Sequence, residues 1–248
     1  MNRLGIIDWG IGGISVYRLL KQKLGDIPVT YFSDTGATPY GKMARRELAS
    51  RLDTVIEYLI EKGVSHVVIG CNAASTAIGD LAPHSSPIEG VIEPAIEMTA
   101  KIKPSRLGLI GGRRTVVSGV YRKAFSHRGM TISQRIAQPL SALIESGDVS
   151  SSELKTQCKR ILSPIKNSSH ILLACTHYPA ITEVLRDFVS PATQFIDPAA
   201  ALVDRISKWK LEAGGSDEFL TTGGAKAMKK AAKAAFGVEI DHIEKITV

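Results

Sequence analysis

The sequence has few cysteines, few aromatic residues and no long apolar run. Three cysteines in 248 residues are too few, and odd in number, for a disulfide framework, so we expect free thiols in a reducing, cytoplasmic compartment. No segment approaches the roughly 18 apolar residues of a membrane span. The first residues, Met1 to Leu4, lead directly into an expected strand and leave no room for a signal peptide. We therefore expect no membrane partner.

The charge is unbalanced, with a net value of +7, and it includes lysines 226, 229, 230 and 233 along an alanine-rich segment. We expect these lysines to form the solvated face of a helix. Aromatic residues make up only 6% of the chain and no nucleic-acid motif is present, so nucleic acid is not an expected partner. The positive charge is suited instead to attracting small anions.

Two segments 104 positions apart, 65–72 and 169–176, have the same pattern. Each begins with a serine and a histidine, continues as an apolar run and reaches a cysteine, Cys71 or Cys175. A short apolar run that ends in small polar residues indicates a buried parallel strand. Each cysteine would then lie at the carboxyl end of its strand, where open α/β sheets bind their ligands.

Two further pairs of similar segments occur with nearly the same separation along the chain. Residues 107–112 resemble 4–8, and residues 195–198 resemble 91–94. The repetition predicts an α/β fold with two similar doubly wound, mainly parallel-sheet domains related by pseudo-two-fold symmetry. We expect the active site in the cleft between them. The predicted domains are residues 1–97 plus 206–248, which form a discontinuous first domain, and residues 98–205.

Other elements follow from periodicity and from turn residues. Residues 137–148 are expected to form a loop that leads into a short helix. Helices are also expected at the starts of the segments that follow Asn72 and Thr176. The remaining expected helices are 15–24, 45–62, 153–165 and 199–210, and the remaining expected strands are 29–32, 88–94, 218–221 and 240–246.

Two thiols on opposite walls of one cleft suit a particular reaction. One thiolate can remove a proton from one face of a carbon, while the opposite thiol returns a proton to the other face. A free thiol is only partly ionised at neutral pH, so neighbouring groups must assist it. The alternative is that Cys71 and Cys175 pack as small hydrophobic residues. Cys158, in the middle of an expected helix, is interpreted as structural.

The nearest candidates for such assistance are Asp8 and His177. Asp8 ends the first strand and could orient or deprotonate Cys71, although it could instead cap the following helix. His177 could serve Cys175 as a base or as a donor, or could be satisfied by the backbone. No second Cys/His pair has zinc spacing, so no metal is expected. The glycine turn after Asp8 is only superficially like a phosphate loop, and no cofactor is expected.

A racemised α-carbon normally carries a carboxylate and an ammonium group. Free N–H groups at helix starts would bind carboxylates. The candidates are the helix starts after Asn72 and Thr176 for the carboxylates and Asp8 and Asp34 for the ammonium group. Further hydrogen bonds can come from Asn72, Thr176 and the loop of Pro39, Tyr40 and Gly41.

Together these motifs resemble those of glutamate racemase, in the aspartate/glutamate racemase superfamily, over nearly the full chain. They are Asp8-Trp9-Gly10-Ile11-Gly12-Gly13, Asp34-Thr35 with Pro39-Tyr40-Gly41, Gly70-Cys71-Asn72, Ile92-Glu93-Pro94, Cys175-Thr176-His177-Tyr178-Pro179 and Thr221-Thr222-Gly223.

The resemblance implies a cofactor-independent racemase that interconverts L- and D-glutamate and supplies D-glutamate for peptidoglycan. It implies Cys71 and Cys175 as the two bases, with Asp8 and His177 assisting, and Glu145 as a further carboxylate near the second cysteine. By the same match, Tyr40, Gly41, Asn72 and Thr176 bind the substrate.

Two positions depart from the family's usual pattern. Trp9 replaces a serine and Ala73 replaces a threonine, and both lost hydroxyls would be expected to touch the amino acid. The sequence therefore leaves open a racemase for another acidic or modified amino acid, an epimerase or decarboxylase of the superfamily, or a catalytically silent ligand-binding paralog. It also leaves open whether the chain forms a homodimer.

Overall fold

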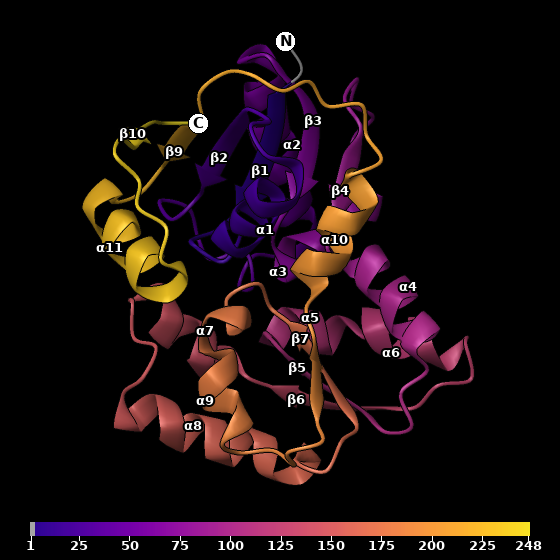
Figure 1. Ribbon diagram of the computed structural model, residues 1–248. Coiled ribbons are helices and arrows are strands. Elements are labelled where there is room, and N and C mark those ends of the chain that lie inside the picture. The colour runs from indigo at the N-terminus through magenta and orange to yellow at the C-terminus, as the bar shows by residue number, and fades with distance from the viewer. Residues whose placement is uncertain (1–2) are drawn as a thin grey trace.

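The computed structural model describes residues 3–248 and contains two parallel β-sheets, each flanked by helices (Figure 1). Met1 and Asn2 lie outside this range, so part of the expectation for residues 1 to 4 lies outside the described residues. The strands of the first sheet are β1 (Arg3–Asp8), β2 (Val29–Ser33), β3 (Val64–Ile69), β4 (Ile88–Gly90), β9 (Glu218–Thr221) and β10 (Glu244–Lys245). Those of the second are β5 (Leu107–Gly111), β6 (Ile132–Ile136), β7 (His170–Ala174) and β8 (Gln194–Ile196).

The two sheets share one spatial order of strands. The first sheet runs β10-β9-β2-β1-β3-β4 and the second runs β6-β5-β7-β8. The four strands β2-β1-β3-β4 of the first sheet thus have the order second, first, third, fourth along the chain, and the second sheet repeats it. The predicted fold class, α/β with two mainly parallel-sheet domains, is confirmed. The boundaries at 97/98 and 205/206 stay predictions.

Helices and single turns fill the connections between strands. The α-helices are α1 (Ile14–Leu24), α2 (Arg45–Glu61), α3 (Asn72–Ser75), α4 (Ile92–Ile102), α5 (Arg113–Ser118), α6 (Val120–Ser126), α7 (Gln138–Glu145), α8 (Ser152–Leu162), α9 (Thr182–Arg186), α10 (Pro198–Ile206) and α11 (Ala225–Phe236). Three short 3₁₀ turns are η1 (Ile78–Asp80), η2 (Ser163–Ile165) and η3 (Tyr178–Ile181). In the described part of the chain, no helix is both long and apolar enough to cross a membrane.

The first sheet is buried on both faces, as its apolar strands predict. Along β1, Ile7 packs into one hydrophobic cluster with the inner face of α2, whereas Ile6 packs into another with α1 and α10. Successive side chains of a strand point to opposite faces, so both faces need an apolar cover. The second cluster continues into the second sheet and includes Leu109 and Leu172. One core therefore joins the two sheets and fixes the ends that carry the site.

The predicted strand at 88–94 is too long. β4 ends at Gly90, and α4 begins at Ile92 with Pro94 in its first turn. Proline is tolerated there because the first N–H groups of a helix have no partner within it. Pro94 therefore lies near the start of a helix instead of stopping a strand.

Other boundaries also differ from the prediction. Residues 138–145 are helical, with Pro139 in the first turn of α7, so Gln138 does not lie in a loop. α10 ends at Ile206, and Trp209 turns away to stack on His66, 5.1 Å between ring centroids. The last strand is only Glu244–Lys245. The predicted helices 15–24 and 45–62 and the strand 218–221 are confirmed within a residue.

Candidate active site

The two cysteines lie at equivalent places, one after the third strand of each repeated half. Cys71 follows β3 and precedes α3, and Cys175 follows β7. Both are free and half-buried. The segments around them meet across the two sheets, because the Thr176 hydroxyl donates a hydrogen bond to Asp8 Oδ2 at 3.4 Å. The carboxyl ends of β1 and β7 therefore face one another, as the sequence predicts.

Asp8, at the end of β1, is buried with its carboxylate turned into the glycine turn. Oδ1 accepts a hydrogen bond from the Trp9 N–H at 2.6 Å, and Oδ2 accepts one from the Gly13 N–H. Burial raises the pKa of Asp8, while His177 and a hydrogen bond with Cys71 lower it. Asp8 thus combines the two roles weighed from the sequence: it orders the turn before α1, and it contacts the first thiol.

The surroundings of Cys71 favour the protonated form of its thiol. Burial raises its pKa, and the nearby charge of Asp8 raises it further, although a backbone hydrogen bond from Ala74 opposes them. A negative charge on Cys175 also raises the pKa of Cys71. The two thiols are therefore electrostatically coupled, and ionisation of one favours the protonated form of the other.

The groups around Cys175 differ from those around Cys71. Its Sγ lies 3.5 Å from His177 Nδ1, and His177 Nε2 lies 2.7 Å from Glu145 Oε2. Burial lowers the pKa of His177, but the charges of Cys175 and Glu145 outweigh it, so that the pKa lies well above its usual range. The raised pKa favours the imidazolium form of His177, which lies between Cys175 and Glu145 and can stabilise a thiolate on Cys175. Glu145 also accepts a hydrogen bond from the Ile11 N–H at 2.9 Å.

The glycines after Asp8 are required by this close approach. A Cβ atom on Gly10 would collide with the Glu145 carboxylate, and one on Gly12 would lie 2.5 Å from His177 Nδ1. Only glycine leaves room for the second half of the chain to close over the turn. The turn therefore serves the contact between the two halves of the site.

Asp34 follows β2 and is completely buried. Its oxygens accept hydrogen bonds from Arg51 Nη2 at 2.7 Å and Arg51 Nε at 2.9 Å, from the Tyr40 hydroxyl at 2.8 Å and from the Thr222 hydroxyl at 2.9 Å. These four bonds use both oxygens and correct the expected contact with an ammonium group. The carboxylate instead holds Tyr40, and with it the loop that contains Pro39 and Gly41.

Trp9 and Ala73 occupy the two positions that depart from the family pattern. Trp9 is half-buried, and its indole N–H donates to the Ala37 carbonyl at 3.0 Å, which ties the glycine turn to the loop before Tyr40. Ala73 is half-buried in the single turn of α3, next to Cys71. Trp9, Ala73 and Cys71 pack against the same hydrophobic cluster, and neither Trp9 nor Ala73 supplies a hydroxyl.

Asn72 presents an unused donor. The Tyr121 hydroxyl donates to Asn72 Oδ1 at 2.8 Å, while Asn72 Nδ2 is buried without a partner among the residues that the structure describes. An unpaired buried amide costs free energy, so a ligand that accepts a hydrogen bond there is favoured. The helix expected after Asn72 is only four residues long, and a 3₁₀ turn, not an α-helix, follows Thr176. These turns leave N–H groups available, although they lack the dipole of a long helix.

Several contributors could not be found from sequence spacing. Tyr31 donates to the Gly10 carbonyl at 2.7 Å, and Arg114 donates to the Tyr40 carbonyl at 3.0 Å and to the Met43 carbonyl. Each comes from an apolar strand or a basic segment with no motif of its own. By contrast Cys158 is fully buried in α8, where burial raises its pKa to about 11, as its structural interpretation predicts.

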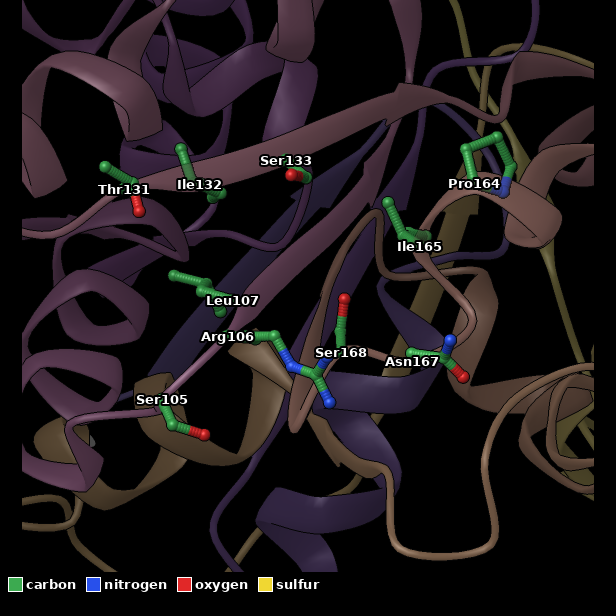
Figure 2. A pocket seen from close by; sticks show the side chains of 10 residues that line it. All are labelled: Ser105, Arg106, Leu107, Thr131, Ile132, Ser133, Pro164, Ile165, Asn167 and Ser168. Atoms are coloured by element: carbon green, nitrogen blue, oxygen red, sulfur yellow. The ribbon is translucent and has the colours of Figure 1, made fainter.

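A cavity of about 280 Å³ lies elsewhere, at the amino edge of the second sheet. Figure 2 shows its lining side chains, which come from the starts of β5 and β6 and from residues 164–168, with Arg106 as the single charged group. It lies at the opposite end of the strands from Cys175. Within residues 3–248, no three His, Cys, Asp or Glu side chains are grouped so as to hold a metal ion.

The fold and the site define an α/β protein with acid–base groups supplied by two repeated halves. The sequence profile of one family, described as Asp/Glu/Hydantoin racemase, matches residues 4–206. The chain belongs to this family.

Individual relatives agree with that assignment. The glutamate racemase of Carboxydothermus hydrogenoformans is 31% identical over 98% of this chain and 95% of its own length. The glutamate racemase of Bacillus cereus is 30% identical over 99% of this chain and 97% of its own. A crystal structure of glutamate racemase isoform RacE1 from Bacillus anthracis superposes with a TM-score of 0.90, at 23% identity, over 100% of this chain and 98% of that one.

Proposed function

We propose that the protein is a cofactor-independent amino-acid racemase that interconverts L- and D-glutamate with two cysteine bases. The observation that carries the proposal is the pair of differently assisted thiols, Cys71 beside Asp8 and Cys175 beside His177 and Glu145. The full-length similarity to named glutamate racemases supports the choice of glutamate. A solved glutamate racemase from Francisella tularensis with D-glutamate, of the same fold, supports a small amino acid as the ligand.

The proposed chemistry uses the two thiols in turn. With one enantiomer, the Cys175 thiolate removes the α-proton, and the Cys71 thiol donates its proton to the opposite face of the carbanion. The product has the inverted configuration, Cys175 is left as the thiol and Cys71 as the thiolate. The other enantiomer runs the same steps backwards. The coupling between the thiols suits this exchange, because it disfavours two simultaneous thiolates.

The surrounding groups supply the remaining assistance. His177 stabilises the thiolate of Cys175, and Glu145 keeps that imidazole protonated and oriented. Asp8, which is hydrogen-bonded to Cys71, can take the proton of this thiol when it must act as the base. The Asn72 amide, which lacks a partner among residues 3–248, and the Thr176 hydroxyl, once it turns from Asp8, would bind a carboxylate of the substrate.

A second candidate follows from Trp9. Its indole stands where the family pattern has a small hydroxyl residue, and it packs against the same hydrophobic cluster as Cys71. A racemase for a different acidic or modified amino acid is therefore the alternative. A catalytically silent binding protein is the candidate from another class.

One experiment separates these functions. The protein is incubated in deuterated water with L-glutamate, D-glutamate and a panel of other amino acids, and α-proton exchange is followed by NMR. We expect exchange with glutamate. Exchange with another amino acid alone would transfer the proposal to that substrate. Exchange with none of them would refute racemisation and favour the binding protein.

Two wider roles belong to the same proposal. D-glutamate made by this reaction would supply peptidoglycan synthesis in the cytoplasm. Depletion of the protein in its host should then impair the cell wall, and added D-glutamate should restore it. Growth unaffected by depletion would contradict this role. Whether the enzyme works as a homodimer is decided by its mass in solution.

A further inference from the structure

A second cavity lies where the two sheets meet, next to the candidate active site. It has a volume of about 330 Å³ and lies between the loop at Gly41, the end of the turn that follows Cys71, and α5. Figure 1 places α3 and α5 together at this junction. The residues that line the cavity are Gly41, Arg45, Thr76, Arg113, Arg114, Val117 and Ser118.

The lining is positively charged. Three of the seven residues are arginines, and none of the described residues that line the cavity is acidic. Arg113 is exposed, its side chain has no ion pair among residues 3–248, and its backbone N–H bonds Gln138 Oε1 at 3.1 Å. Arg45 pairs with Asp80 at 2.5 Å on the surface, where solvent screens the pair. An excess of positive charge therefore remains.

Arg114 adds a charge that no carboxylate of residues 3–248 neutralises. Its guanidinium donates to the carbonyls of Tyr40 and Met43, which are dipoles without net charge. Burial lowers the pKa of Arg114, and the like charge of Arg45 lowers it further. Both effects are relieved when an anion enters the cavity, because an opposite charge favours the protonated guanidinium.

The cavity is also linked to the reacting group. A negative charge on Cys71 raises the pKa of Arg114, so the thiolate and the guanidinium are within electrostatic reach. Thr76 follows α3, which begins immediately after Cys71, and Gly41 belongs to the loop held by Tyr40. A ligand in the cavity therefore borders both the expected substrate loop, at Gly41, and the segment that follows the first thiol, at Thr76.

We propose that Arg113, Arg114 and Arg45 form an anion-binding entrance that draws small carboxylates toward Cys71. A positively charged hollow with low-dielectric walls concentrates anions and speeds their association. The carboxylate ligand is the acidic amino-acid substrate, and this identification rests on the function proposed above. The entrance itself is a property of the arginines and can be tested without turnover.

The first test compares an anionic and a neutral reagent. Iodoacetate and iodoacetamide both react with thiolates, so the ratio of their rates at Cys71, followed by peptide mass spectrometry, cancels the degree of ionisation. Arg113→Gln should lower the iodoacetate-to-iodoacetamide ratio by roughly threefold or more at low salt. High salt should remove the difference, because the charges are screened.

A matched control keeps the same change in net charge. Lys226→Gln removes a positive charge from an exposed position on α11, at the left edge of Figure 1 and away from α5. It should leave the ratio unchanged. If the iodoacetate-to-iodoacetamide ratio falls equally in both variants, the effect is one of net charge and the proposed entrance is refuted. A ratio that Arg113→Gln leaves unchanged would also refute it.

The second test uses turnover. Arg113→Gln should lower kcat/KM for glutamate several-fold through a raised KM, with the loss disappearing at high salt, and Arg113→Lys should restore most of it. A fall in kcat that persists at high salt would contradict an entrance. If no amino acid is turned over, the proposed function fails while the alkylation ratio still decides the anion site.

Discussion

His177 Nε2 lies 2.7 Å from Glu145 Oε2, and this contact joins the end of α7 to the loop that follows the second cysteine. The carboxylate is half-buried and also accepts the Ile11 N–H of the first half. Glu145 therefore sets the charge of the imidazole and at the same time ties the two halves of the site together.

Glu145→Gln should move the alkaline limit of activity to lower pH. The raised pKa of His177 keeps the imidazolium protonated below that pKa, and activity that needs it is lost as pH rises through the same value. Removing the Glu145 charge lowers the pKa, and each unit is a roughly tenfold change in the protonation equilibrium. The measurement is a pH profile of kcat/KM. Glu153→Gln, on the exposed start of α8, is the control, and profiles of the same shape in wild type and Glu145→Gln would contradict the role.

The pH dependence of stability has the same sign. The folded-state pKa of His177 is above its unfolded value, so its contribution is complete below about pH 6.5 and is lost as pH rises through the folded-state pKa. His177→Gln should therefore flatten the fall in the free energy of unfolding on the alkaline side. Urea unfolding at several pH values measures it. If the slope of the free energy of unfolding against pH is unchanged, His177 binds its proton equally well in the folded and unfolded states.

Cys71→Ser and Cys175→Ser should each abolish racemisation, with a loss of roughly 100-fold or more. One of the two variants can still exchange the α-proton of a single enantiomer, because the remaining thiol reaches only one face. Exchange of each enantiomer in deuterated water checks this. Equal and substantial racemisation after either change would end the two-base account, and Cys158→Ser, in the core of α8, is the control for thiol loss.

Trp9→Ser should raise turnover of glutamate. The change removes a large ring from the cluster that Trp9 shares with Cys71, supplies the hydroxyl of the family pattern and removes the indole bond to the Ala37 carbonyl. Trp9→Phe separates the two effects, since it keeps most of the ring but loses the N–H. If Trp9→Ser alters neither turnover nor affinity, Trp9 lies outside the pocket.

Arg51→Gln should destabilise the fold by about 3 kcal/mol, because it leaves the buried Asp34 carboxylate without its two-point ion pair. Chemical unfolding measures the change, and Arg46→Gln, on the exposed side of α2, should have little effect. Adding Asp34→Asn to Arg51→Gln should recover part of the loss. Full additivity of the two changes would show that the pair is not coupled.

The repeated strands and both cysteines could be predicted because their signals are local. A short apolar run followed by Cys71 or Cys175 specifies a buried strand and the place of a thiol at its end. The same is true of Asp8, the last residue of β1. Local patterns also set the helices, since the apolar spacing of residues 45–62 is preserved in α2.

The role of Asp34 could not be predicted from local sequence signals. Its position after a strand resembles that of Asp8, but its partners Arg51 and Thr222 come from a helix and from the far end of the chain. Which carboxylate is neutralised and which is left for chemistry depends on packing between distant segments. Tyr121 could not be predicted for the same reason. It belongs to the second half of the chain, and its hydroxyl orients Asn72 in the first half.

The return of β9 and β10 to the first sheet has a mechanical consequence. The chain passes from one sheet to the other twice, once between β4 and β5 and once between β8 and β9. Two covalent crossings limit the movement of one sheet relative to the other to bending about the line that joins them. Any opening of the site to admit a ligand would therefore be restricted by the path of the backbone as well as by the side chains at the entrance.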